Sequence, residues 1–235
     1  MIDWTSVKAE VANHLQLLLR IDTTNPPGNE TEAARYVSRV LEGEGFETEI
    51  TESQPGRGNV TTRLRGGDQP PLLLLGHLDV VACEPDLWTH PPFGGELHDG
   101  FIWGRGALDM KNMVAAELMV ILLLKREGVA LNRDLIYAAT ADEEAGNGEH
   151  GPGWMLDNRP ELIDAPFILT EGGGSDLRLG GRRFYTCQTG QKGICRMRVH
   201  ARGVPGHGSI PHNQNAVVKL CQALGRLQDV DLPLH

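Results

Sequence analysis

The chain has 235 residues and a formal net charge of −9 at pH 7, from 31 Asp and Glu residues against 22 Lys and Arg residues. Its 40% hydrophobic and 23% charged residues are typical of a globular protein that buries a core. The acidic balance, with no basic run longer than Arg182–Arg183, argues against nucleic acid and anionic membranes as partners.

No targeting or membrane segment is visible in the sequence. The N-terminal residues, MIDWTSVKAEV, lack a cationic stretch followed by an apolar one. The most apolar predicted helix, around Met113–Leu124, is interrupted by Glu117 and is shorter than the ~20 residues that a membrane span needs. The 4 cysteines show no Cys-x-x-Cys spacing, which favours reduced thiols. We therefore expect a cytoplasmic protein.

Hydrophobic spacing predicts helices and strands in alternation. The first helix is capped by Asp3, and the second begins at a capping arrangement of Asn29 and Glu32. The run Leu72–Leu75 predicts a strand that is buried on both faces. Further strands are predicted at residues 46–50, 59–64, 134–141 and 167–170, with a helix over about 109–126.

This alternation predicts an α/β fold, a mostly parallel sheet flanked by helices, over residues 1–190. The pattern changes near Gly190, where a one-sided strand over residues 194–201 precedes a turn with His207 and a helix over about 214–227. One strand and one helix cannot close a core of their own. Residues 191–235 therefore read as the start of a second, α+β domain that is incomplete in this chain.

Acidic and imidazole side chains follow the predicted strands in four stretches, GHLDVV, GRGALDMK, TADEEAG and LTEGGG. They contribute His77, Asp79, Asp109, Glu143, Glu144 and Glu171. Parallel strands place their carboxyl ends at one sheet edge, where so many carboxylates repel one another unless cations lie between them. A His with carboxylates suits zinc, cobalt or manganese. Taken singly, each of these residues has an ordinary explanation. His77 and Asp79 could be a polar pair at a strand end, and Asp109 could cap the helix after it. Glu143 and Glu144 could be a solvated loop pair, and Glu171 a turn residue.

Together with TTNPPGNE upstream and GVPGHGSIP downstream, the four stretches resemble the M20 family of metallopeptidases. That family includes glutamate carboxypeptidases, acetylornithine deacetylase, succinyl-diaminopimelate desuccinylase and aminoacylase-1. The resemblance implies a zinc-peptidase-like catalytic domain followed by a lid and dimerisation domain. It also implies a two-metal hydrolase, most often with zinc, that cleaves an amide bond of a peptide or N-acyl amino acid carrying a carboxylate. Dimeric members associate through the lid.

The resemblance assigns a role to each residue. It implies that His77 and Glu171 ligate one metal, that Glu144 ligates the other, and that Asp109 bridges both, in a loop with a cis peptide after the Asp. Asp79 would orient His77. Glu143 matches the general base that activates a metal-bridging water, and His207 matches a lid histidine that stabilises the oxyanion in the partner's active site.

Full-length family members continue past the end of this chain and supply a last His ligand, which His235 does not match. We therefore expect an N-terminal fragment that is inactive on its own, and a non-catalytic truncated homologue is one alternative. A second alternative is a dinucleotide-binding oxidoreductase, since Gly146–Gly151 fits G-x-G-x-x-G and Glu171 lies 20 residues further on. Acidic residues before these glycines would repel a pyrophosphate, and Pro152–Gly153 fits a helix start poorly. A serine hydrolase is disfavoured because no G-x-S-x-G elbow is present.

Overall fold

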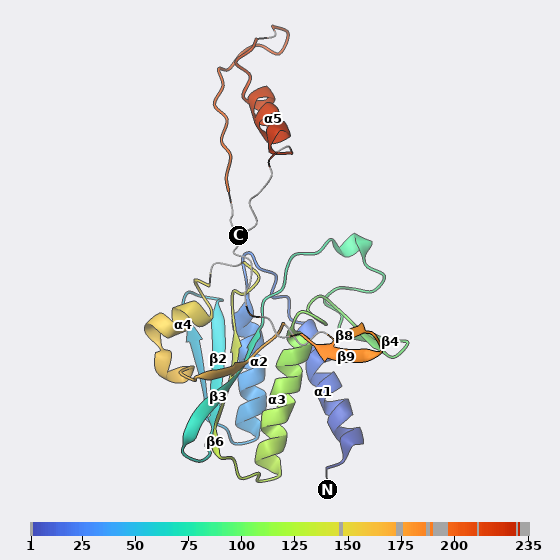
Figure 1. Cartoon of the computed structure of the whole chain (residues 1–235), viewed down its shortest axis with the longest axis vertical. Coiled ribbons are helices and arrows are strands. Elements are labelled where there is room, and N and C mark those ends of the chain that lie inside the picture. The colour runs from blue at the N-terminus through green and yellow to red at the C-terminus, as the bar shows by residue number, and fades with distance from the viewer. Residues whose placement is uncertain are drawn as a thin grey trace. The chain divides into compact units, whose positions relative to one another are not determined.

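The computed structural model describes residues 2–145, 148–172, 176–186, 189, 197–210, 212–228 and 230. The chain divides into two compact units, Met1–Gln188 and Thr189–His235. Figure 1 shows the fold of each unit.

A five-stranded sheet in the order β1-β2-β6-β3-β7 forms the centre of the first unit (Figure 1). Its strands are β1 (Thr48–Glu52), β2 (Gly58–Leu64), β3 (Gln69–His77), β6 (Arg133–Thr140) and β7 (Phe167–Leu169). The pairs β3·β6 and β3·β7 are parallel, while β1·β2 and β2·β6 are antiparallel. Four of these strands therefore run in one direction and β2 runs against them, which confirms the predicted α/β class with a mostly parallel sheet.

The leucine run lies in β3, between β6 and the edge strand β7. Leu72 pairs with Leu135 and the register continues to His77, which pairs with Thr140. Leu73 and Leu74 are buried, and they belong to different apolar clusters on the two faces of the sheet. Burial on both faces explains why this strand is a continuous apolar run rather than an alternating one.

Helices cover both faces. The larger core cluster joins β3 and β6 to three helices, α1 (Trp4–Leu19), α2 (Glu30–Gly43) and α3 (Lys111–Arg126). On the opposite face, Leu73 and Ile136 pack against Met155 of α4 (Pro152–Asn158) and Ile163, which follows the 3-10 turn η2 (Pro160–Leu162). The sheet is thus the middle layer of a three-layer arrangement, with helices packed on both of its faces.

The N-termini of α1, α2 and α4 test three expectations from the sequence. The Asp3 side chain accepts a hydrogen bond from the Thr5 backbone N–H at 3.0 Å, so the predicted cap of α1 is confirmed. Asn29 is the N-cap of α2, but its side chain makes no capping hydrogen bond, so the predicted capping arrangement there is wrong. The expectation that Pro152–Gly153 fits a helix start poorly is also wrong. Gly151 is the N-cap of α4, and proline is accepted in a first helical turn.

Two short antiparallel hairpins complete the first unit. The segment between β3 and α3 contains the 3-10 turn η1 (Pro85–Leu87) and the pair β4 (Glu96–His98) and β5 (Phe101–Trp103). The pair β8 (Asp176–Leu179) and β9 (Arg182–Tyr185) follows β7. No residue-pattern argument had predicted either hairpin.

The second unit contains α5 (Ala216–Leu227), whose N-cap Asn215 accepts hydrogen bonds from Val217 and Val218. The predicted strand over residues 194–201 falls partly outside the described residues, and its described part is not in a strand. Among the helices of the described residues, none is both long and apolar enough to cross a membrane.

Candidate metal centre

His77 is the last residue of β3, and Asp79 follows it at the sheet edge. Both are buried, at 2% and 0% exposure. His77 Nδ1 lies 3.0 Å from the backbone carbonyl of Asp79 and 3.4 Å from its carboxylate. A carbonyl oxygen only accepts, so Nδ1–H donates to it, and the neutral ring then carries its lone pair on Nε2. This arrangement prepares an imidazole to ligate a metal through Nε2.

Three carboxylates surround that Nε2 atom. It lies 3.2 Å from Asp109 Oδ1, 3.4 Å from Glu171 Oε1 and 3.9 Å from Glu143 Oε2. Asp109 precedes α3, and the two glutamates follow β6 and β7. The parallel directions of β3, β6 and β7 bring these segments to one edge of the sheet, as their order in the sequence predicted.

Two sets of three side chains could each hold a metal ion there. One set is His77, Glu143 and Glu171, and the other is His77, Asp109 and Glu144. Within each set the ligand atoms lie within 4.8 Å of one another. The structure therefore brings together all six first-unit residues that the sequence singled out, with Asp79 behind His77. It also has the cis peptide between Asp109 and Met110 that the resemblance implied.

Burial and the mutual charges of these side chains shift their pKa values. Burial opposes a charged imidazole, but the hydrogen bond and charge of Asp79, with the charges of Glu171 and Glu143, outweigh it and raise the pKa of His77 to about 9. Burial and the charge of Asp109 raise the pKa values of both Glu144 and Glu171. A divalent cation beside Nε2 would balance the charge of these carboxylates. The donor set, one imidazole and several carboxylates, fits zinc, cobalt or manganese.

Asp79 also supports the loop that follows β6. Its carboxylate accepts hydrogen bonds from the backbone N–H groups of Glu143 and Glu144, both at 3.1 Å, and from Asn25 Nδ2 at 2.8 Å. Burial alone would raise the pKa of Asp79, but the hydrogen bonds from His77 and Asn25 lower it below its usual value. An ionised Asp79 thus contacts the His77 imidazole and also holds the backbone of Glu143 and Glu144.

A second buried network lies beside Asp79, and no sequence argument found it. Asn25 Nδ2 also donates to Asp142 Oδ1 at 3.0 Å, and Arg57 Nη2 donates to the same oxygen at 2.9 Å. Arg57 Nε lies 2.9 Å from Glu30 Oε2. Burial raises the pKa of Glu30 to about 7, against the charge of Arg57. The stretch TTNPPGNE, which contains Asn25 and Glu30, could have pointed to this network. Arg57 lies in a turn between two strands, and no sequence pattern marks it.

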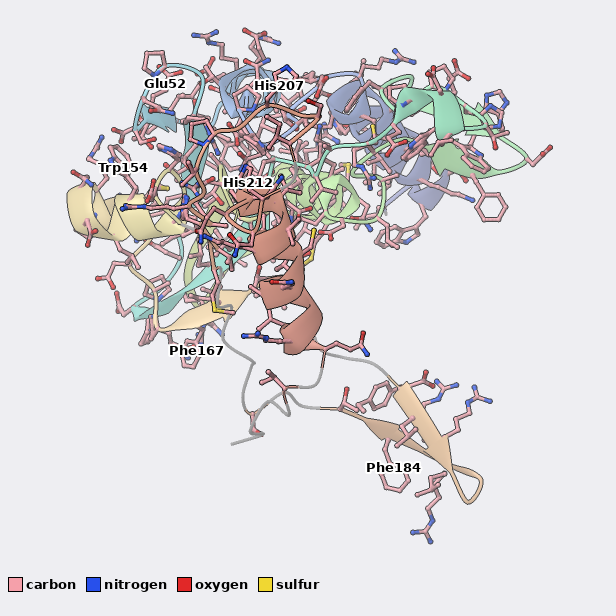
Figure 2. All side chains as sticks on the ribbon, turned by 90° about the horizontal axis from the view of Figure 1, so that it is seen from above. Glu52, Trp154, Phe167, Phe184, His207 and His212 are labelled. Atoms are coloured by element: carbon pink, nitrogen blue, oxygen red, sulfur yellow. The ribbon has the colours of Figure 1, made fainter. Side chains whose placement is uncertain are left out.

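His207 belongs to the second unit, so its predicted role at this centre stays a prediction. Its Nδ1 lies 2.7 Å from Ser209 Oγ, in the loop before α5 (Figure 2). A pocket in that unit is lined by His207 together with His212 and Asn215.

Known proteins resemble this chain in sequence and in fold. The model of peptidase family M20/M25/M40 matches residues 73–229, which is more than half of the chain and includes the Gly146–Gly151 stretch. A succinyl-diaminopimelate desuccinylase of Paracoccus denitrificans is 33% identical over 220 residues, covering 92% of this chain and 55% of the relative. A probable carboxypeptidase S-like protein of Dictyostelium discoideum is 36% identical over 166 residues, covering 68% of this chain and 32% of the relative.

The chain spans about half the length, or less, of the curated relatives it matches. Among solved structures, an M20 family metallo-carboxypeptidase of Sulfolobus solfataricus aligns with a TM-score of 0.61 at 24% identity, covering 70% of this chain and 38% of that one. At this identity the alignment supports the fold, and the sequence match carries the family assignment. The chain belongs to peptidase family M20/M25/M40.

Proposed function

We propose that the whole protein is a metal-dependent hydrolase that cleaves a C–N amide bond in a peptide or an N-acyl amino acid. The observation that carries the proposal is the meeting of one buried imidazole nitrogen with three carboxylates from three separate segments, all within 3.9 Å. Such a set is costly without a cation and is suited to hold one.

In this proposal His77, Asp109, Glu144 and Glu171 hold two divalent ions, for which zinc fits best and cobalt or manganese are alternatives. When bound, such ions polarise a scissile carbonyl and stabilise the charge that develops on its oxygen. Asp79 keeps His77 in the tautomer that offers Nε2. The same carboxylate holds the backbone of the two glutamates, so that each side chain projects from a fixed point.

Glu143 is the proposed general base. Its side chain is 55% exposed, while its backbone N–H is held by the Asp79 carboxylate. From that position the carboxylate can take a proton from an attacking water and return it to the leaving amine. His207 is the proposed donor to the oxyanion, acting in a homodimer formed through the second domain, with residues 1–190 as the catalytic domain.

The substrate class follows from what the relatives share. Their names include a succinyl-diaminopimelate desuccinylase, a carboxypeptidase S-like protein and an N-fatty-acyl-amino acid synthase/hydrolase. Each of these names points to an amide bond beside a free carboxylate. We propose a small substrate with that pairing, hydrolysed in the cytoplasm.

The test uses the full-length protein that contains this chain. It is stripped of metal with a chelator and assayed against an N-succinyl diamino acid, an N-fatty-acyl amino acid and a C-terminally free dipeptide, before and after Zn²⁺, Co²⁺ or Mn²⁺ is restored. We expect hydrolysis of at least one substrate, abolished by chelation and regained with metal. Hydrolysis that is indifferent to chelation, or no hydrolysis of any of the three with any metal, would overturn the proposal.

A further inference from the structure

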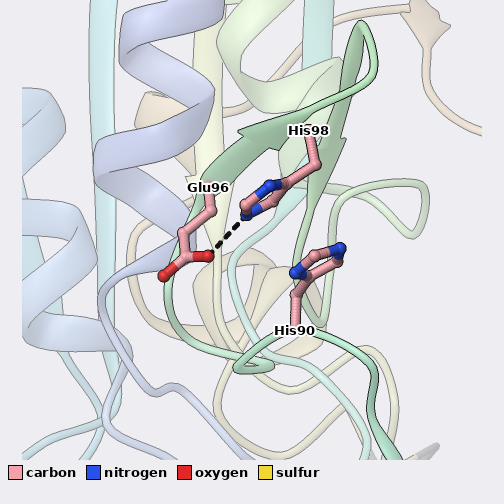
Figure 3. Close-up of side chains that lie close together, drawn as sticks. All are labelled: His90, Glu96 and His98. Atoms are coloured by element: carbon pink, nitrogen blue, oxygen red, sulfur yellow. Dashed lines mark hydrogen bonds and ion pairs between the residues drawn. The ribbon is translucent and has the colours of Figure 1, made fainter.

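A second cluster of ligating side chains lies in the segment between β3 and α3. His90, Glu96 and His98 place their ligand atoms within 4.8 Å of one another (Figure 3). Glu96 and His98 stand two residues apart on β4, so they share one face of the hairpin, and His90 comes from the loop before it. This cluster shares no residue with the centre at His77.

The three side chains are already in mutual contact. His98 Nε2 lies 2.7 Å from Glu96 Oε2, and the rings of His90 and His98 stack with centroids 3.7 Å apart and planes 8° apart (Figure 3). Trp103, which pairs with Glu96 across the hairpin, packs edge-on against His90 at 4.8 Å.

The backbone beneath the cluster is fixed before any ligand arrives. Gln16 Nε2 of α1 donates to the Gly95 carbonyl at 2.8 Å, and Arg20 Nε donates to the Gly94 carbonyl at 3.2 Å. Gly95 has a φ of +57°, and a Cβ there would meet Gln16 O at 2.3 Å, so this turn needs glycine. The anchored turn separates His90 from the hairpin residues and sets the distance between them.

We propose that His90, Glu96 and His98 bind a Zn²⁺ ion, with water completing its coordination. Two imidazole nitrogens and one carboxylate are a donor set that zinc accepts. Ligand atoms on one tetrahedral zinc lie about 3.4 Å apart, given bonds of roughly 2.1 Å. To ligate one ion, the 2.7 Å pair has to open slightly, the wider distances have to shorten, and the two stacked rings have to turn so that the ion lies in the plane of each.

The ion would act as a clamp and not as a catalyst. It would tie the loop at His90 to the β4–β5 hairpin and so restrain the segment between them. Trp88, two residues before His90, and Arg105, two residues after β5, line a hollow together with Cys83 and Leu87. The arginine guanidinium lies 5.3 Å from the tryptophan ring centre. A bound ion would therefore keep Trp88 and Arg105 in one arrangement on the wall of this hollow.

The test is a Zn²⁺ titration of the metal-free 235-residue chain by calorimetry. The first centre is removed by the double substitution His77→Ala with Asp109→Ala, so that any remaining zinc belongs elsewhere. We expect one equivalent to remain, with a rise in Tm on zinc addition. Adding His98→Ala should weaken this binding at least tenfold, whereas adding His200→Ala, at an exposed histidine of the second unit, should leave it unchanged.

His90→Gln serves as a second variant, because it keeps a polar side chain of similar reach and removes the imidazole. Circular dichroism confirms that each variant is folded. Loss of the remaining equivalent in both His98→Ala and His90→Gln supports the site. Equal zinc binding with and without these residues would overturn it. So would the absence of a remaining equivalent, which would mean that Glu96 and His98 form an ion pair only.

Discussion

The carboxylate of Asp79 accepts a hydrogen bond from the backbone N–H of Glu143, 3.1 Å away and 64 residues later in the chain. The same carboxylate faces Nδ1 of His77 at 3.4 Å. The buried carboxylate therefore helps to orient a proposed metal ligand, whose tautomer follows from the Asp79 backbone carbonyl at 3.0 Å, and it also positions the proposed base. Because these two roles meet in a single side chain, metal affinity and catalysis are expected to depend on it together.

Replacing Asp79 by Asn is expected to weaken metal binding. An amide NH₂ group would face a backbone N–H donor or the imidazole, so at least one of the present hydrogen bonds is lost. Loss of such an orienting partner typically lowers metal affinity 10- to 100-fold. Calorimetric titration with Zn²⁺ measures the change. Asp86→Asn, at an exposed aspartate in η1, is the matched control, and an equal affinity for both variants would contradict the role given to Asp79.

Glu143→Gln separates chemistry from metal binding. In the full-length protein we expect turnover to fall by about 10²–10⁴-fold, because the amide cannot accept the proton from water. Metal content, measured by mass spectrometry of the purified protein, is expected to stay close to that of the unsubstituted protein. Glu149→Gln, at an exposed glutamate of the same loop, should retain activity. Loss of metal in proportion to activity would instead make Glu143 a ligand.

Arg57→Met tests the buried network beside the site. The Arg57 side chain is 5% exposed and lies between Glu30 and Asp142, whose side chains are 0% and 3% exposed. Removing the cation leaves two carboxylates without their partner, which typically costs about 3–5 kcal/mol of unfolding free energy. Urea denaturation measures it.

Arg35→Met is the control for this substitution. The ion pair of Arg35 with Glu32 is more than half exposed, so its loss should cost less than about 1 kcal/mol. Similar losses for both arginine variants would show that the buried network contributes no more than a surface pair.

Glu117 gives the chain a pH dependence of known sign. It lies on α3 at 5% exposure, and among the described residues neither of its carboxylate oxygens has a hydrogen-bond partner; burial raises its pKa to about 8. The folded state therefore keeps a proton that the unfolded state loses near pH 4.5, so the unfolded state gains stability from ionisation as the pH rises. From pH 5 to pH 8 this group alone should lower the unfolding free energy by roughly 3–4 kcal/mol.

The measurement compares Glu117→Gln with the unsubstituted chain by urea denaturation at several pH values, both without metal. The glutamine variant should show a shallower loss of stability between pH 5 and pH 8, since other titrating groups are common to both proteins. Glu127→Gln, an exposed glutamate after the same helix, should keep the original slope. Parallel curves for all three proteins would rule out the raised pKa.

The sequence was a good guide to the proposed metal centre and a poor one to its surroundings. The centre could be predicted because parallel strands place the residues at their carboxyl ends along one edge, which is where His77, Glu143 and Glu171 meet. Asp109 reaches the same place from the segment before α3. Arg57 could not be predicted, because it pairs with Asp142 across 85 residues and nothing local marks that contact.

The two hairpins are a different kind of failure, because a local signal was present. Asp99–Gly100 joins β4 to β5 and Gly180–Gly181 joins β8 to β9, with all four residues at positive φ. Asp-Gly and Gly-Gly are signals for two-residue hairpin turns. The start of α2 is the opposite case: the helix begins after Asn29 as the capping pattern predicted, but the Asn29 side chain makes no capping hydrogen bond.

β7 lies at the edge of the sheet, beside β3 alone among the described strands. Its side chains Phe167, Ile168 and Leu169 are 52–56% exposed. A short apolar strand with one free edge is a template on which another strand can form. At high concentration, copies of this chain are therefore expected to pair along the edge of β7 that carries no partner among the described strands.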